Sequence, residues 1–173
     1  MTRRTWLRPL RGGMNLNVAL EFLLRVQSHK SVAVVVSDFI GSPAEAKSNS
    51  RRKLRPQMQL LESLAQASFT MLKQVNRRHD VVAVQITDRY ELELPALGRL
   101  VLCDAETGEV IEINTSDARK RDAFALRQAK VLNDTARLFR SAGIDSIQLR
   151  TDQPYGAALG KFFETREKRR RHG

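Results

Sequence analysis

Histidine and cysteine side chains do not form a recognisable catalytic or zinc site in this sequence. The histidines are His29, His79 and His172, and none stands at metal-ligand spacing from Cys103 or from another histidine. His79 and Asp80 are adjacent just before an expected strand, where successive side chains point to opposite faces, so we interpret them as structural rather than as a catalytic dyad. The sequence has neither a Gly-rich phosphate loop with Lys-Ser/Thr nor a Gly-x-Ser-x-Gly elbow. We therefore expect no enzymatic activity.

Asp38 is an acidic side chain whose position suggests a binding function. It follows the valine-rich run 32–36 through Ser37, at the end of an expected strand. Open α/β sheets bind ligands beyond the carboxyl ends of their strands, so a carboxylate there is suited to contact a ligand or a partner. The alternative is that Asp38 caps a helix or turn, and the residues alone favour that alternative.

Two valine-rich runs predict parallel strands. Residues 31–37 are apolar between two serines, which is typical of a strand covered on both faces, and residues 81–86 have a similar composition. Residues 58–78 between them have a helical apolar period, so the order is strand, helix, strand with a right-handed crossover. Residues 15–28 predict a preceding helix, with Asn15 or Asn17 as its cap. Residues 41–57 are polar and basic and predict a loop.

The second half of the chain predicts a β-hairpin, a long helix, a third strand and a last helix. Residues 99–103 and 109–113 flank a Gly-containing connection of hairpin length. Ser116 or Asp117 is expected to cap a helix that runs to Ser141 and ends at Gly143. The third strand is expected over residues 145–150, and the last helix from Asp152 and Pro154 to about Arg166.

We expect one domain over residues 14–166, between a basic N-terminal segment at 1–13 and a basic tail at 167–173, of which residues 168–172 are expected to be frayed. Residues 1–13, 47–55 and 161–171 carry 15 basic and 2 acidic side chains of a chain whose net charge is +11, so the remainder has a net charge of −2. We interpret these segments as solvated, and nucleic-acid binding would rest on their charge alone. No apolar run reaches the roughly 18–20 residues of a membrane span, and one cysteine forms no internal disulfide, so we expect a soluble, cytoplasmic protein.

Several short segments occur in the order and spacing of a known family. They are Arg-Gly-Gly-Met-Asn-Leu at 11–16, Val-Val-Val-Ser-Asp-Phe-Ile at 34–40, Arg-His-Asp-Val-Val-Ala-Val at 78–84, Asp-Ala-Glu-Thr-Gly at 104–108 and Thr-Asp-Gln-Pro-Tyr at 151–155. On these segments the chain resembles the bacterial domain-of-unknown-function family numbered fifty-eight. Members of that family are often found with MoxR-type AAA+ ATPases and have a von Willebrand factor A-like fold. The resemblance is to the C-terminal half of that fold.

The resemblance implies a metal-ion-dependent adhesion site, in which oxygen ligands hold magnesium and leave a position for a partner's carboxylate. Asp38 resembles the aspartate that follows the fourth strand in such a site. Met14 stands where the family usually has a threonine, and a thioether is a poor ligand for magnesium. The first metal loop, Asp-x-Ser-x-Ser, is absent from the sequence. We therefore expect Asp38 to be a remnant that binds no cofactor, with magnesium bound only if another chain supplies the missing half.

The resemblance also implies an incomplete doubly wound, Rossmann-like sheet, mainly parallel and with an inserted β-hairpin. Residues 31–37 would then form an apolar edge strand, which is a site of pairing or aggregation. Three explanations stay open: a partner chain completes the sheet, the basic N-terminal segment covers the edge, or the chain is a truncated gene product. We predict a non-catalytic protein-interaction module that acts with a MoxR-type AAA+ ATPase, with Ser37, Asp38 and Asn15 as partner-binding side chains. A basic nucleic-acid-binding protein and a non-functional gene fragment are the alternatives.

Overall fold

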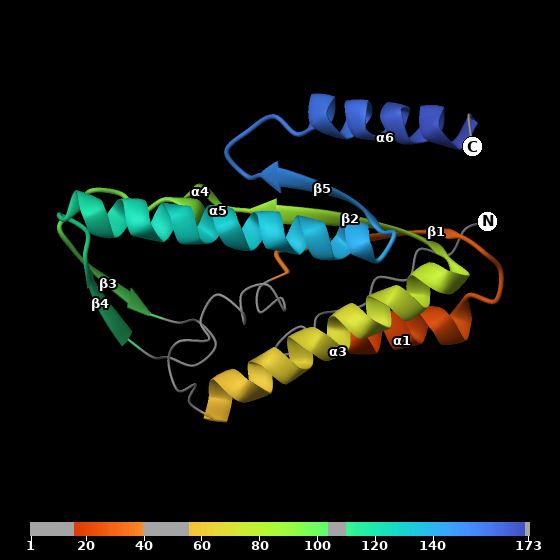
Figure 1. Cartoon of the computed structure of the whole chain (residues 1–173), viewed down its shortest axis with the longest axis horizontal. Coiled ribbons are helices and arrows are strands. Elements are labelled where there is room, and N and C mark those ends of the chain that lie inside the picture. The colour runs from red at the N-terminus through yellow and green to blue at the C-terminus, as the bar shows by residue number, and fades with distance from the viewer. Residues whose placement is uncertain (1–15, 40–55, 104–109, 172–173) are drawn as a thin grey trace, which may run out of the picture.

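A three-stranded parallel sheet forms the centre of the molecule (Figure 1). The computed structural model describes residues 16–39, 56–103 and 110–171. The strands are β1 (Val32–Ser37), β2 (Asp80–Thr87) and β5 (Asp145–Arg150), in the spatial order β1-β2-β5. Val34 lies opposite Val82, and Val84 lies opposite Ile147. The predicted α/β, Rossmann-like class and its parallel strands are confirmed, whereas the predicted loop at 41–57 lies largely outside the described residues.

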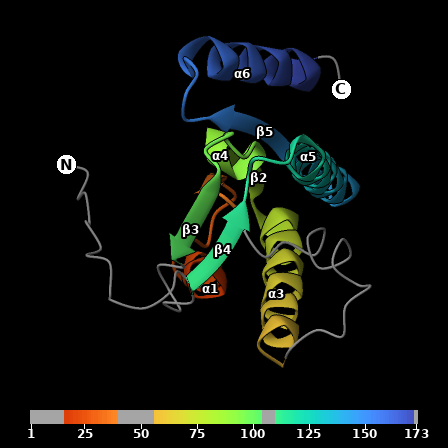
Figure 2. The same ribbon diagram turned by 90° about the vertical axis from the view of Figure 1, so that its left-hand side faces the viewer.

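Helices lie on both sides of this sheet. On one side, α1 (Leu16–Val26), α3 (Pro56–Arg78) and α5 (Ala118–Ser141) pack into one core with the strands. The buried members of that core are Leu20, Phe69, Leu72, Val75, Val81, Ala83, Phe139 and Ile144. The last helix, α6 (Gly156–Arg171), lies on the opposite side from α1 and α3 (Figures 1 and 2). Within the described residues, no helix could serve as a membrane span.

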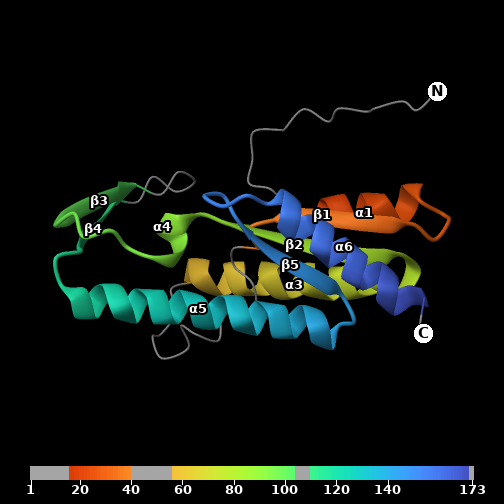
Figure 3. The same cartoon turned by 90° about the horizontal axis from the view of Figure 1, so that it is seen from above.

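The predicted hairpin is also confirmed and forms a second, separate sheet. β3 (Arg99–Cys103) pairs antiparallel with β4 (Val110–Asn114). Figure 3 shows the hairpin at the end of the molecule toward which β2 runs. The buried Thr115 hydroxyl fixes its base, because it donates to the Gly98 carbonyl at 2.8 Å and accepts from the Leu97 amide at 3.1 Å. Asp117 then caps α5, as predicted, and Gly143 follows that helix with a φ of +68°.

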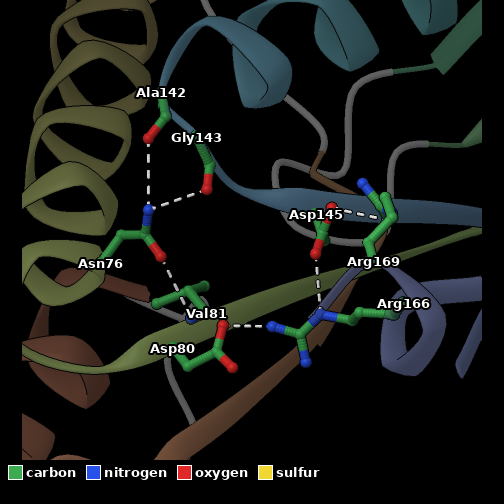
Figure 4. Close-up of polar contacts among 8 residues, drawn as sticks. All are labelled: Asn76, Asp80, Val81, Ala142, Gly143, Asp145, Arg166 and Arg169. Carbon is green, nitrogen blue, oxygen red and sulfur yellow. Dashed lines mark hydrogen bonds and ion pairs between the residues drawn. The ribbon is translucent and has the colours of Figure 1, made fainter. Parts of the chain in front are cut away.

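The last helix extends further than the sequence predicted. α6 continues to Arg171, so the prediction that the tail is frayed from Lys168 is wrong for residues 168–171. A buried cation anchors this helix to the sheet: Arg166, only 8% exposed, reaches from α6 to Asp80 at the start of β2 and to Asp145 at the start of β5 (Figure 4). Its Nε lies 2.7 Å from Asp145 Oδ2, and Arg169 lies 3.2 Å from the other oxygen of the same carboxylate.

Candidate partner-binding edge

Among the described residues β1 is covered on one face only, which differs from the prediction that it is covered on both faces. Ala33 and Val35 pack against the helical core. The alternate side chains are half exposed on the other face: Val32 by 53%, Val34 by 51% and Val36 by 54%. The sequence could not show this, because a continuous apolar run shows that both faces are apolar but not that both are covered.

The contrast with β2 identifies what is missing over β1. Val82 and Val84 lie opposite Val34 and Val36, yet they are only 0% and 5% exposed. β2 has a strand on each side. The ion pairs of Arg166 hold α6 at β2 and β5, on the face of the sheet that carries Val82 and Val84. The exposure of the β1 valines shows that no described element covers them in the same way.

β1 also has a strand neighbour on one side only within the described residues. The Asp80 amide donates to the Ser31 carbonyl at 2.8 Å. Because backbone groups alternate in direction along a strand, the amides of residues 33, 35 and 37 point toward β2 and those of residues 32, 34 and 36 point away. An apolar edge strand with outward backbone groups is a template for pairing with another chain.

Two of the three predicted partner-binding residues lie at the carboxyl end of this strand. The Ser37 hydroxyl donates to Asp38 Oδ1 at 3.3 Å, and Gln85 Nε2 donates to the backbone carbonyl of Asp38 at 3.2 Å. Asp38 is exposed. Asn15 lies outside the described residues, as does Met14.

A sharp turn after β1 separates Asp38 from the core. Phe39 has a φ of +53°, which is an uncommon, strained conformation for a bulky residue. Its amide donates to Ser37 Oγ at 3.1 Å, and its ring packs edge-on against Phe139 at a centroid distance of 4.9 Å. The aromatic contact offsets the backbone strain, so the chain enters the core at Phe39 while Asp38 stays at the surface.

The described residues do not fit a magnesium site. Asp88 follows β2, but its Oδ1 accepts from the Tyr90 amide at 2.9 Å and its Oδ2 accepts from the Thr151 hydroxyl at 2.7 Å. These hydrogen bonds, chiefly the one from Tyr90, hold the pKa of the Asp88 carboxyl below its ordinary value of 3.8. Residues 16–39, 56–103 and 110–171 contain no group of three or more His, Cys, Asp or Glu side chains able to hold a metal. Asp38 alone is too few ligands for a hard cation.

Sequence reasoning missed a polar network at the carboxyl ends of β2 and β5. Arg150 donates two hydrogen bonds to Asp152, of 2.9 and 2.7 Å, which lower the pKa of Asp152 and raise the pKa of Arg150. Asp88 also begins the short helix α4 (Arg89–Leu92) in a capping box with Glu91. The Asp-x-x-Glu spacing was the available sequence signal for α4, because a capping box needs these side chains three residues apart.

At the opposite end of the sheet, His79 and Asp80 have different partners. His79 is 3% exposed, and its Nδ1 lies 3.2 Å from the Ser31 hydroxyl. Asp80 instead pairs with Arg166. The two side chains therefore do not form a dyad, and both hold elements of the fold together.

Comparison with known proteins identifies the family. The family described as "Protein of unknown function DUF58" matches residues 4–133. The chain belongs to this family. An uncharacterized protein of Mycobacterium avium is 33% identical to this DUF58 chain over 154 residues, which are 89% of this chain and 77% of the relative. Uncharacterized proteins of Mycobacterium bovis and Mycobacterium tuberculosis are each 32% identical over 154 residues, but this chain spans only 41% of their length. No solved structure matches the DUF58 chain.

Proposed function

We propose that this DUF58 chain is a non-catalytic protein-interaction module that receives another polypeptide along the open edge of β1. The observation that carries the proposal is an edge strand with one strand neighbour in the described residues and three half-exposed valines on one face. Added strands bind such edges through main-chain hydrogen bonds, and alternate side chains give specificity. Burying the valines would add a hydrophobic contribution to the binding free energy.

The partner that we propose is a MoxR-type AAA+ ATPase or a chain that acts with it. This choice rests on the family resemblance of the sequence segments. Ser37 and Asp38, at the carboxyl end of the same strand, would contact the partner together with Asn15. Magnesium would bind at Asp38 only if the partner supplied the remaining oxygen ligands.

The basic side chains of α6 favour this proposal over nucleic-acid binding. Several of its arginines are engaged with carboxylates in the structure: Arg166 with Asp80 and Asp145, Arg169 with Asp145, and Arg171 with Glu167. A guanidinium that already pairs with a carboxylate has to exchange that partner before it can bind phosphate. The positive charge of this helix is therefore partly neutralised, and it offers less attraction to a nucleic acid.

The test compares two lysine substitutions at exposed apolar positions. Val34→Lys places a charge at the open edge of β1, and Leu126→Lys places the same charge on α5, where Leu126 is 73% exposed. Each variant is measured for binding to a purified MoxR-type AAA+ ATPase by biolayer interferometry. We expect Val34→Lys to weaken binding by at least about tenfold and Leu126→Lys to leave it unchanged. Equal binding by both variants would exclude the β1 edge, and no binding by the unmodified chain would exclude this ATPase.

A further inference from the structure

A polar cavity lies at the end of the sheet where β2 and β5 begin. Its volume is about 450 Å³, which is enough for a small-molecule ligand. The described residues that line it are all polar, charged or glycine: Lys30, Asn76, His79, Asp80, Gly143, Asp145, Arg166 and Arg169. Because the three strands are parallel, this cavity and the predicted partner-binding residues Ser37 and Asp38 lie at opposite ends of the sheet.

Hydrogen bonds and ion pairs hold the wall of this cavity in place (Figure 4). Asn76, near the end of α3, donates to the carbonyls of Ala142 and Gly143, at 3.2 and 3.0 Å. It also accepts from the Val81 amide at 3.1 Å, so it ties α3 to β2 and to the turn before β5. Arg166 ties α6 to the starts of β2 and β5 through its ion pairs. A ligand would therefore meet a wall that is already formed.

One buried ring nitrogen of the lining lacks a partner. His79 is 3% exposed, and its Nδ1 lies 3.2 Å from the Ser31 hydroxyl. Its Nε2 is buried and has no hydrogen-bond partner within the described residues. Buried polar atoms nearly always have such partners, because removing an unpaired one from water costs free energy. The unpaired Nε2 therefore favours a polar molecule bound at this wall.

Two cations of the lining retain donors for a ligand. Lys30 is exposed and has no ion pair within the described part of the chain. Arg169, whose side chain is 61% exposed, pairs with Asp145 through one of its guanidinium nitrogens at 3.2 Å. A guanidinium has several N–H donors, so others remain for a ligand. Both side chains can therefore bind an anionic oxygen.

The charge of the lining favours a ligand with a single negative charge. The lining contains three cations and two carboxylates, so its net charge is +1 when His79 is neutral. One carboxylate balances this charge. A phosphate monoester carries about two negative charges at neutral pH and would be repelled by Asp80 and Asp145. The polar lining also favours a hydroxylated molecule over a hydrocarbon, because its polar groups need hydrogen-bond partners when a ligand displaces water.

We infer that this cavity binds a small hydroxylated molecule that carries one carboxylate. Lys30 and Arg169 bind the carboxylate through charge-assisted hydrogen bonds. A hydroxyl group of the ligand bonds to Nε2 of His79, which it can do as donor or as acceptor. The inference does not depend on the proposed function, because the lining includes no residue of β1.

The test titrates the full chain with gluconate, a hydroxylated monocarboxylate, and follows its NMR signals. Sorbitol is the uncharged counterpart of gluconate, and inorganic phosphate is the more highly charged anion. We expect gluconate to bind saturably in the millimolar range and to shift the ring signals of His79. Sorbitol and phosphate should bind at least about fivefold more weakly.

Matched substitutions test the two cations. Lys30→Gln and Arg169→Gln should each weaken gluconate binding by at least about fivefold. Lys161→Gln on α6 and Arg137→Gln, which removes an exposed ion pair with Asp134, take away the same charges outside the cavity and should leave binding unchanged. All four substituted side chains are exposed, so the variants should keep the unfolding temperature of the unmodified chain.

Several results would overturn the inference. A titration in which gluconate does not saturate, or in which the His79 signals stay unchanged, would exclude this ligand class from the cavity. Phosphate binding as tight as that of gluconate would contradict the preference for a single charge. Equal losses in the cavity variants and in the controls would show that the overall charge of +11 attracts gluconate without a defined site.

Discussion

β1 and β2 are adjacent strands of similar composition in very different surroundings. Val82 of β2 is 0% exposed, whereas Val34, directly opposite it in β1, is 51% exposed. β2 has two strand neighbours, and Arg166 holds α6 on the face of β2 that carries Val82. β1 has one strand neighbour in the described residues. A valine-rich strand is stabilised when its side chains are buried, but the sequence of the strand does not determine whether another element of the same chain covers them.

The comparison predicts its largest effect for the same substitution made in both strands. Val82→Lys should lower the free energy of unfolding by more than about 4 kcal/mol, because an ammonium group would be buried without a partner. Val34→Lys should change it by less than about 1 kcal/mol, because its side chain can stay in water. Urea unfolding followed by circular dichroism measures both values. Similar losses in the two variants would show that the face of β1 that carries Val32, Val34 and Val36 is covered.

A second prediction concerns what holds α6 on the β2 side. Arg166→Met should destabilise the fold by about 2–4 kcal/mol, because it removes the buried cation that pairs with both Asp80 and Asp145 and leaves Asp145 with the exposed Arg169. Arg169→Ala should cost less than about 1 kcal/mol, because the Arg169 side chain is 61% exposed and its ion pair is screened by water. The same urea experiment compares them. Equal, small effects would contradict the role of Arg166 in holding α6 to the sheet.

A smaller effect is predicted in acid, at the carboxyl end of β2. The pKa of Asp88 is lowered chiefly by the Tyr90 amide and then by the Thr151 hydroxyl. A carboxyl with a lowered folded-state pKa stabilises the fold above its ordinary value of 3.8, and this contribution is lost as the pH falls through the folded-state pKa. Thr151→Val should therefore raise the pKa of Asp88 and shift acid unfolding to higher pH. An unchanged Asp88 titration in carboxyl-carbon NMR would contradict the hydrogen-bond assignment.

The smallest effect is expected for magnesium. Calorimetric titration of the isolated chain should show no saturable site in the micromolar range, because the described residues contain no group of three or more His, Cys, Asp or Glu side chains able to hold a metal. The Asp38→Ala variant should give the same result. A tight site that Asp38→Ala removes would show that the isolated chain holds a complete set of ligands.

The elements that the sequence predicted correctly are those set by local signals. The valine runs predicted β1 and β2, the glycine-containing connection predicted the β3–β4 hairpin, and Asp117 predicted the start of α5. The contacts that hold α6 could not be predicted in this way, because Arg166 pairs with Asp80, which lies 86 residues away. Local composition contains no information about such distant partners.

The candidate site was predictable to the same extent. Ser37 and Asp38 were predicted to lie at the end of a strand because they follow an apolar run directly, and β1 confirms that position, whereas their contact with a partner stays a prediction. The exposure of Val32, Val34 and Val36 was not predicted, because it depends on which helices the rest of the chain places over the sheet. Val18, Phe22 and Val26 stand at four-residue spacing in the sequence, but only the packing of α1 shows that these side chains remain exposed.

Hydrogen exchange of the β1 amides, resolved by NMR, tests the open edge most directly. In the isolated chain, residues 33, 35 and 37 should exchange slowly because their amides point toward β2, and residues 32, 34 and 36 should exchange fast because theirs point outward. Addition of a chain that pairs with β1 should slow the fast set and leave the slow set unchanged. Slow exchange at all six residues in an isolated monomer would contradict the account, because it would show that this chain already covers its own edge.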